Sequence, residues 1–173
     1  EKRNFDLLTL GQVLLRLSPP NNDRLVRGDT FVKQVGGAEL NVAVGVALLG
    51  LRTGVISKLP SHDMGSFMKG KIRSYGVSDD FFMYDDSPSA RVGIYYYENG
   101  AYPRKPKVIY DRANSSFYSL KIDEIPEKAY TASRCFHTSG ITLALSPKVR
   151  ETTIEMIKRF KAAGTLVSFD VNF

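Results

Sequence analysis

A pair of adjacent glycines, Gly36 and Gly37, stands just before an apolar stretch at residues 42–49. Glycine has no Cβ atom, so its backbone can adopt a positive φ and lets a ligand approach the N–H groups at a helix start. Asn41 follows about one turn into that helix and offers both a donor and an acceptor, which suit a sugar hydroxyl. The pattern predicts the floor of a site for a small polar ligand. The alternative is a tight turn in which Asn41 caps the helix.

Two β-rich segments, residues 91–97 and 107–112, carry several tyrosines. The loop between them contains Asn-Gly and Tyr-Pro pairs, so we predict an antiparallel hairpin that stands off the main sheet. Side chains alternate along a strand, and Tyr95 and Tyr97 therefore share a face that Tyr96 does not. Such a hairpin could form a lid over a binding site; alternatively, its tyrosines pack against a sheet edge.

Two polar residues, Asp170 and Asn172, fall at the end of a predicted strand over residues 165–172. In open parallel sheets, ligands bind at the edge formed by the carboxyl ends of the strands. Asp170 and Asn172 are therefore further candidates for the site.

The elements that would position these residues alternate between strands and helices. We predict strands over residues 5–10, 12–17, 30–35, 53–59, 77–84, 133–140 and 165–172, and helices over 42–49, 67–75, 123–130 and from 147 to the capping Gly164. Repeats of this length favour βαβ units and hence an α/β fold with a parallel sheet. Residues 42–49 are apolar on every face, which predicts a helix covered on all sides.

Composition fits one folded domain, with 43% apolar residues and a formal charge of +6 that favours anionic ligands. No run of Lys and Arg indicates nucleic-acid binding. The single cysteine, Cys135, is expected to be a buried core thiol, His137 a core residue and His62 a loop residue. We find no signal-peptide pattern, no long apolar span and no Cys/His metal spacing, so we expect a cytoplasmic protein without a membrane partner.

The glycine stretch resembles the signature of a known family. The spaced pattern Gly36-Gly37-x-x-x-Asn41 is similar to the first signature of the pfkB, or ribokinase-like, carbohydrate kinases. The resemblance implies a partly parallel sheet flanked by helices, with a small β-sheet lid built near residues 13–35 and 90–112.

The predicted hairpin narrows the resemblance to one subgroup. Gly93-Ile94-Tyr95, followed by Tyr110-x-Arg112, is similar to the substrate-lid pattern of 2-keto-3-deoxygluconate kinases. The resemblance implies that Tyr95, Tyr110 and Arg112 hold a sugar acid, and a guanidinium does pair bidentately with a carboxylate. Many relatives carry an aspartate for a neutral sugar diol near the position of Arg16. That arginine is thus a further candidate for binding an acid.

The resemblance spans all 173 residues but corresponds to roughly the N-terminal half of such a kinase. Motifs that would bind ATP and Mg²⁺ and supply the catalytic aspartate are absent from this sequence, so we assign no catalytic or metal-binding residue within it. We expect residues 1–173 to form the substrate-binding part of an ATP-dependent kinase and to be inactive alone.

These features predict transfer of the γ-phosphate of ATP to 2-keto-3-deoxygluconate. A fructokinase-like or other pfkB hexose kinase is the alternative within the same class. An alternative of another class is a sugar-binding or interaction module without catalytic activity. The resemblance also implies a homodimer formed through the lid.

Overall fold

The computed structural model describes residues 3–172; residues 1, 2 and 173 of the predicted domain, 1–173, lie outside the described part. A five-stranded sheet forms its centre, and its strands all pair in parallel. In spatial order they are β5 (Val77–Asp85), β4 (Thr53–Pro60), β1 (Phe5–Leu10), β8 (Ser133–Ser139) and β9 (Leu166–Asp170). This sheet confirms the predicted α/β class.

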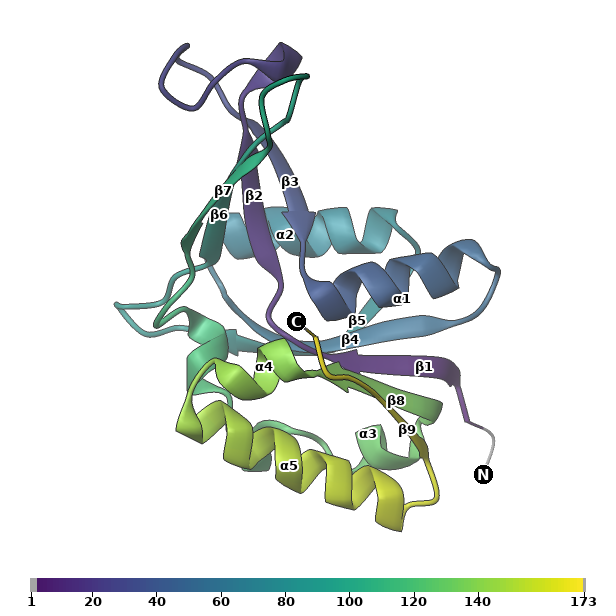
Figure 1. Ribbon diagram of the computed structural model, residues 1–173. Coiled ribbons are helices and arrows are strands. Elements are labelled where there is room, and N and C mark those ends of the chain that lie inside the picture. Colours follow the sequence, from purple (N-terminus) through teal and green to yellow (C-terminus); the bar gives the residue numbers. More distant parts are fainter. Residues whose placement is uncertain (1–2, 173) are drawn as a thin grey trace.

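Helices cover both faces of the parallel sheet (Figure 1). On one face lie α1 (Ala38–Leu48) and α2 (Asp63–Ser74), and on the other α3 (Lys128–Thr131), α4 (Gly140–Ala144) and α5 (Pro147–Ala162). Three short 3-10 helices complete the described elements: η1 (Pro20–Asn22), η2 (Ser116–Ser119) and η3 (Ile122–Glu124).

A second, mixed sheet of four strands stands off the first as a small lid (Figure 1). In spatial order its strands are β3 (Val32–Gly36), β2 (Leu14–Ser18), β6 (Gly93–Glu98) and β7 (Lys107–Asp111). β6 and β7 pair antiparallel, which confirms the predicted hairpin. β2 and β6 come from distant parts of the sequence and pair in parallel, so they join the two lid segments.

The core lies in two layers, one on each face of the parallel sheet. Val55 and Ile56 are neighbours in β4 but belong to opposite layers, as strand alternation requires. In the layer beneath α5, the rings of Phe136 and Phe160 stack with centroids 4.0 Å apart. Helices on both sides thus bury a sheet whose strands are apolar on both faces.

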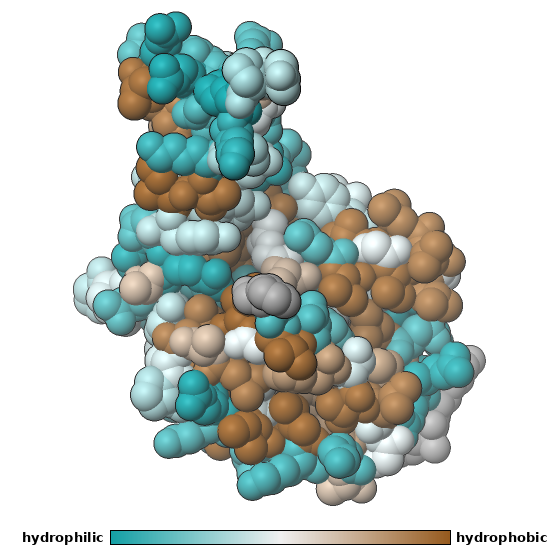
Figure 2. All heavy atoms as spheres, in the orientation of Figure 1, coloured by the Kyte–Doolittle hydropathy of each residue, from teal (hydrophilic) through white to brown (hydrophobic). Residues whose placement is uncertain are grey.

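The prediction that residues 42–49 are covered on all sides is wrong for the described residues. Leu40 and Ala43 face the sheet and are buried, whereas Leu48 and Leu49 are 80% and 79% exposed. Figure 2 shows hydrophobic side chains gathered over this helix and hydrophilic ones over the tip of the lid. Only one face of α1 packs against the sheet, so its apolar composition does not mean burial all round.

A single helix over residues 123–130 is also wrong, because the chain forms η3 and α3 as separate short pieces there. Pro126 lies between them, and proline has no N–H to continue a helical hydrogen-bond ladder. The short helix α4, directly after β8, was not predicted. No helix within residues 3–172 is both long and apolar enough to cross a membrane.

Cys135 is only partly buried, which corrects the prediction of a fully buried thiol, and this burial raises its pKa. His137 is a buried residue of β8, as predicted; its Nδ1 lies 2.9 Å from the Ser168 Oγ, and burial lowers its pKa. His62 directly precedes α2, where its Nδ1 accepts a hydrogen bond from the Met64 N–H.

Candidate functional site

A cavity of about 290 Å³ lies between the lid and the carboxyl edge of the parallel sheet. Its lining residues are Leu14, Arg16, Gly37, Ala38, Glu39, Asn41, Tyr95, Tyr97, Val108, Tyr110, Arg112 and Ile141. All of the predicted site residues except Gly36, Asp170 and Asn172 are among them. The direction of strand order reverses between β1 and β8, and open parallel sheets bind ligands at such a switch point.

Three neighbouring lid strands present a row of polar side chains to this cavity. Arg16 in β2 is the register partner of Tyr95 in β6, and Tyr95 is the partner of Tyr110 in β7. The two tyrosine rings lie 6.0 Å apart. Tyr97 lines the same cavity two residues beyond Tyr95, whereas Tyr96 does not, so the predicted alternation is confirmed.

Gly36 leaves space for the Tyr95 side chain, a role that the sequence did not predict. It lies in β3, before the helix start, and a Cβ atom placed on it would be 2.6 Å from the Tyr95 hydroxyl oxygen. A tyrosine hydroxyl is protonated at neutral pH and can donate a hydrogen bond, and burial raises the pKa of Tyr95 further. The missing side chain of Gly36 therefore makes room for a hydrogen-bonding group.

We expect Gly36→Ala to displace the Tyr95 hydroxyl and raise the dissociation constant of a ligand bound in this cavity about threefold to tenfold, the effect of one lost hydrogen bond. Tyr95→Phe should have a similar effect. In the Tyr95→Phe background, Gly36→Ala should add little, because the remaining ring atoms would lie 3.5 and 3.6 Å from the new Cβ. Additive losses in the double variant would mean that Gly36 acts independently of Tyr95.

Gly37, in contrast, occupies the cap position of α1 with φ 145° and ψ 143°. The backbone N–H of Asn41 donates to the Gly37 carbonyl oxygen at 2.8 Å, so Asn41 lies inside the helix and does not cap it. The exposed Asn41 side chain lines the cavity. Gly37 and Asn41 thus both line the cavity, and their role as the floor of a binding site stays a prediction.

Arg112 brings a guanidinium group to the cavity at the end of β7. Its Nε–H donates to the Gln12 Oε1 at 2.8 Å. Neighbouring Asp111 pairs instead with Arg91, at 2.8 Å, and among residues 3–172 no carboxylate forms an ion pair with Arg112. The positive charge of Arg112 is thus left for a ligand.

Arg16 adds a second guanidinium to the cavity lining. Its Nε–H donates to the Ser18 Oγ at 3.0 Å, and its Cζ atom lies 4.3 Å from the centre of the Tyr97 ring. A cation over an aromatic face is held in place without losing its charge. The cavity therefore offers two guanidinium groups to an anionic ligand.

Glu39, in the first turn of α1, lines the cavity but was not singled out from the sequence. It is 2% exposed, and its Oε1 accepts hydrogen bonds from the Ser139 Oγ at 2.5 Å and the Thr142 Oγ1 at 2.7 Å. These bonds tie the helix that carries Asn41 to β8 and α4. A carboxyl group so close to the glycine pair was the sequence signal for this role.

The structure does not place Asp170 and Asn172 in the cavity lining. The Asn172 side chain donates to the Asp170 Oδ2 at 2.8 Å, and its Oδ1 accepts from the Ile141 N–H at 3.2 Å. Both residues thus lie next to the start of α4, whose Ile141 does line the cavity. A direct role for Asp170 and Asn172 stays a prediction.

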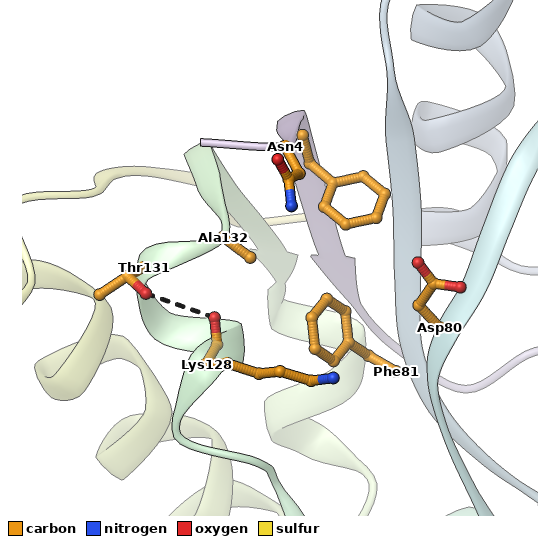
Figure 3. Close-up of a pocket in the computed structure, with 7 residues that line it drawn as sticks. Asn4, Asp80, Phe81, Lys128, Thr131 and Ala132 are labelled. Atoms are coloured by element: carbon orange, nitrogen blue, oxygen red, sulfur yellow. Dashed lines mark hydrogen bonds between the residues drawn. The ribbon is translucent and has the colours of Figure 1, made fainter. Parts of the chain in front are cut away.

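A larger cavity, of about 550 Å³, lies beside the amino ends of β1 and β8 (Figure 3). Figure 3 shows Asp80 and Lys128 on its walls, and the described residues form no ion pair between them. Its one drawn hydrogen bond joins the Thr131 Oγ1 to the Lys128 carbonyl oxygen. It lies at the amino ends of the strands, opposite the edge where open parallel sheets bind ligands, and is therefore a poorer candidate than the cavity under the lid.

Within 3–172, no three His, Cys, Asp or Glu side chains are placed to hold a metal ion together. Mg²⁺ is usually held by one or two carboxylates together with water and phosphate oxygens, so the Mg²⁺ that the family resemblance implies stays an expectation for the intact protein.

The fold and the cavity define an α/β protein with a cavity beneath a β-sheet lid, lined by two guanidinium groups. The pattern that describes pfkB family carbohydrate kinases matches residues 4–173. The chain therefore belongs to the pfkB family of carbohydrate kinases, which confirms the resemblance.

The chain is 39% identical over 168 residues to a 2-dehydro-3-deoxygalactonokinase of Haloferax volcanii, covering 97% of the chain and 52% of that relative. It is 30% identical to a 5-dehydro-2-deoxygluconokinase of Shouchella clausii, and the match covers 100% of the chain and 52% of that relative. The crystal structure of 2-dehydro-3-deoxygluconokinase from Thermotoga maritima matches with a TM-score of 0.91 and 36% identity. The match covers 98% of this chain and 51% of that structure's chain. The chain spans about half the length of the curated relatives that it matches.

Proposed function

We propose that this chain is the substrate-binding part of a kinase that phosphorylates a 2-keto-3-deoxy sugar acid, with 2-keto-3-deoxygluconate as the preferred substrate. The observation that carries the proposal is the Arg112 guanidinium in the cavity, with no ion-pair partner among the described residues. The relatives named as kinases of dehydro-deoxy sugar acids support the same substrate class.

The remaining cavity residues suit the rest of such a molecule. Tyr95, Tyr110 and Asn41 offer hydroxyl and amide groups for sugar hydroxyls, and the Gly37 backbone lies at the floor. Val108 and Leu14 supply apolar walls. In our proposal the lid residues bind and orient the acid and exclude water from it, so that its reacting hydroxyl is presented in a fixed position.

ATP and Mg²⁺ belong to the proposal for the whole kinase. ATP would supply the phosphoryl group, and Mg²⁺ would offset charge on the phosphates. In this proposal residues 1–173 contribute substrate binding. We also propose a cytoplasmic location. We further propose that two copies pair through their lids, and sedimentation analysis of the purified protein would test whether it forms a dimer.

The experiment is a substrate panel for the purified intact kinase with ATP and Mg²⁺, measured as ADP release. We expect kcat/KM for 2-keto-3-deoxygluconate to exceed that for fructose at least about tenfold, from the carboxylate contact alone. The C4 epimer, 2-keto-3-deoxygalactonate, belongs in the panel because a relative is named for it. Residues 1–173 by themselves serve as a control that should release no ADP.

Each alternative has its own outcome in this panel. A preference for fructose would support the fructokinase-like function. Binding of a sugar acid by the intact protein without any phosphorylation would support a module that lacks catalytic activity. ADP release by residues 1–173 above a control without enzyme would contradict the assignment of substrate binding alone to this chain.

A further inference from the structure

Gln12 lies just after β1, where the chain passes from the parallel sheet to the lid, and it is 3% exposed. A buried amide is costly unless its polar atoms are hydrogen-bonded. Its Oε1 accepts the Arg112 Nε–H at 2.8 Å, and its Nε2 donates to the Arg112 carbonyl oxygen at 3.2 Å and to the Ser115 Oγ at 2.5 Å. Gln12 therefore holds both the side chain and the backbone of Arg112.

The chemistry of these partners allows one orientation of the amide. A guanidinium only donates hydrogen bonds, so the Gln12 oxygen must face the side chain of Arg112. A carbonyl oxygen only accepts them, so the amide nitrogen must face the backbone of Arg112. Gly93 leaves the space for this arrangement, since a Cβ atom there would lie 2.7 Å from the Gln12 Nε2.

The hydrogen bond to Gln12 uses the Nε–H of the Arg112 guanidinium and leaves its two terminal nitrogens for a ligand. Nε is bonded to Gln12, while among residues 3–172 neither terminal nitrogen of Arg112 has a hydrogen-bond partner. Two terminal N–H groups are what a guanidinium uses to bind a carboxylate in a bidentate way. Gln12 is also neutral, so it fixes the arginine without pairing its charge.

We propose that Gln12 is a positioning residue for the sugar-acid site, which holds Arg112 with its terminal nitrogens directed to the substrate carboxylate. This inference rests on the proposed function. Arginine has a long side chain with much rotamer freedom, and holding it before the ligand arrives removes part of the entropic cost of binding.

The test compares Gln12→Leu and Gln12→Glu in the intact kinase. Leucine is apolar and removes the acceptor, so we expect KM for 2-keto-3-deoxygluconate to rise about tenfold with little change in kcat. Glutamate keeps an acceptor for the Nε–H but adds a charge and cannot donate to the Arg112 carbonyl oxygen, so its KM should lie between those of the wild type and Gln12→Leu. KM for fructose, which has no carboxylate, should change less than about twofold in both variants.

A double-variant cycle separates positioning from a structural role. In an Arg112→Ala background, Gln12→Leu should change KM for the acid less than about twofold, because there is no guanidinium left to position. An equal rise in both backgrounds, or an equal rise for the acid and fructose, would overturn the inference. Should Gln12→Leu fail to fold, Gln12→Asn takes its place with the same expectation, since it shortens the side chain by one methylene.

The cycle also separates this inference from the proposed function. If Arg112→Ala leaves KM for the acid unchanged, the sugar-acid proposal fails at its central residue. If Arg112→Ala raises that KM and Gln12→Leu does not, the sugar-acid proposal stands and the role of Gln12 is refuted.

Discussion

Arg112→Ala is expected to raise the KM of the intact kinase for 2-keto-3-deoxygluconate at least about tenfold. Hydrogen bonds to charged groups contribute roughly 1.5–3 kcal/mol, which corresponds to about tenfold to a hundredfold in affinity. Arg112→Lys should recover only part of the loss, because an ammonium group cannot reproduce the planar fork of a guanidinium. Steady-state kinetics with the acid as the varied substrate measures both effects.

Fructose and a second arginine provide the controls for this result. Fructose has no carboxylate, so its KM should scarcely change in either variant. Arg24 is an exposed arginine between η1 and β3 that does not line the cavity, and Arg24→Ala should leave KM for the acid unchanged. Equal losses for the acid and fructose would indicate a general defect of the lid.

Local patterns in the sequence predict much of the fold because strands and helices leave regular signals. Alternation in the hairpin placed Tyr95 and Tyr97 on one face, and the register of β6 and β7 confirms it. The glycine pair marked the start of α1 because few other residues tolerate the backbone conformation found at Gly37. Where a local rule decides the structure, sequence reasoning succeeds.

Contacts between distant residues could not be predicted in the same way. Gln12 and Arg112 are separated by 100 positions, and the pairing of β2 with β6 and of β6 with β7 brings them together. The space that Gly36 leaves for Tyr95 depends likewise on the placement of β3 beside the cavity. The exposed face of α1 depends on which elements surround the helix, and composition does not specify them.

Replacing Gly37 by valine is expected to destabilise the protein and distort the floor of the cavity. With φ 145° and ψ 143°, Gly37 has a backbone conformation that is close to glycine-only, and strain of this kind costs about 1–3 kcal/mol. A Cβ atom would also lie 2.7 Å from the Gln12 carbonyl oxygen, a backbone atom that cannot rotate away. We therefore expect a lower free energy of unfolding and a higher KM for the sugar acid.

Gly45 provides a matched control within the same helix. A Cβ atom there would meet no atom within 4 Å, and its φ is not positive, so Gly45→Ala should leave KM unchanged and stabilise the protein by about 0.4–1 kcal/mol through the unfolded state. Urea denaturation and steady-state kinetics of the two variants separate a general intolerance of α1 from a specific need at Gly37. If Gly37→Val unfolds at the wild-type urea concentration and binds the acid normally, Gly37 forms only a turn. Opposite effects of the two substitutions on stability, with a loss of affinity at Gly37 alone, would show that Gly37 shapes the binding site.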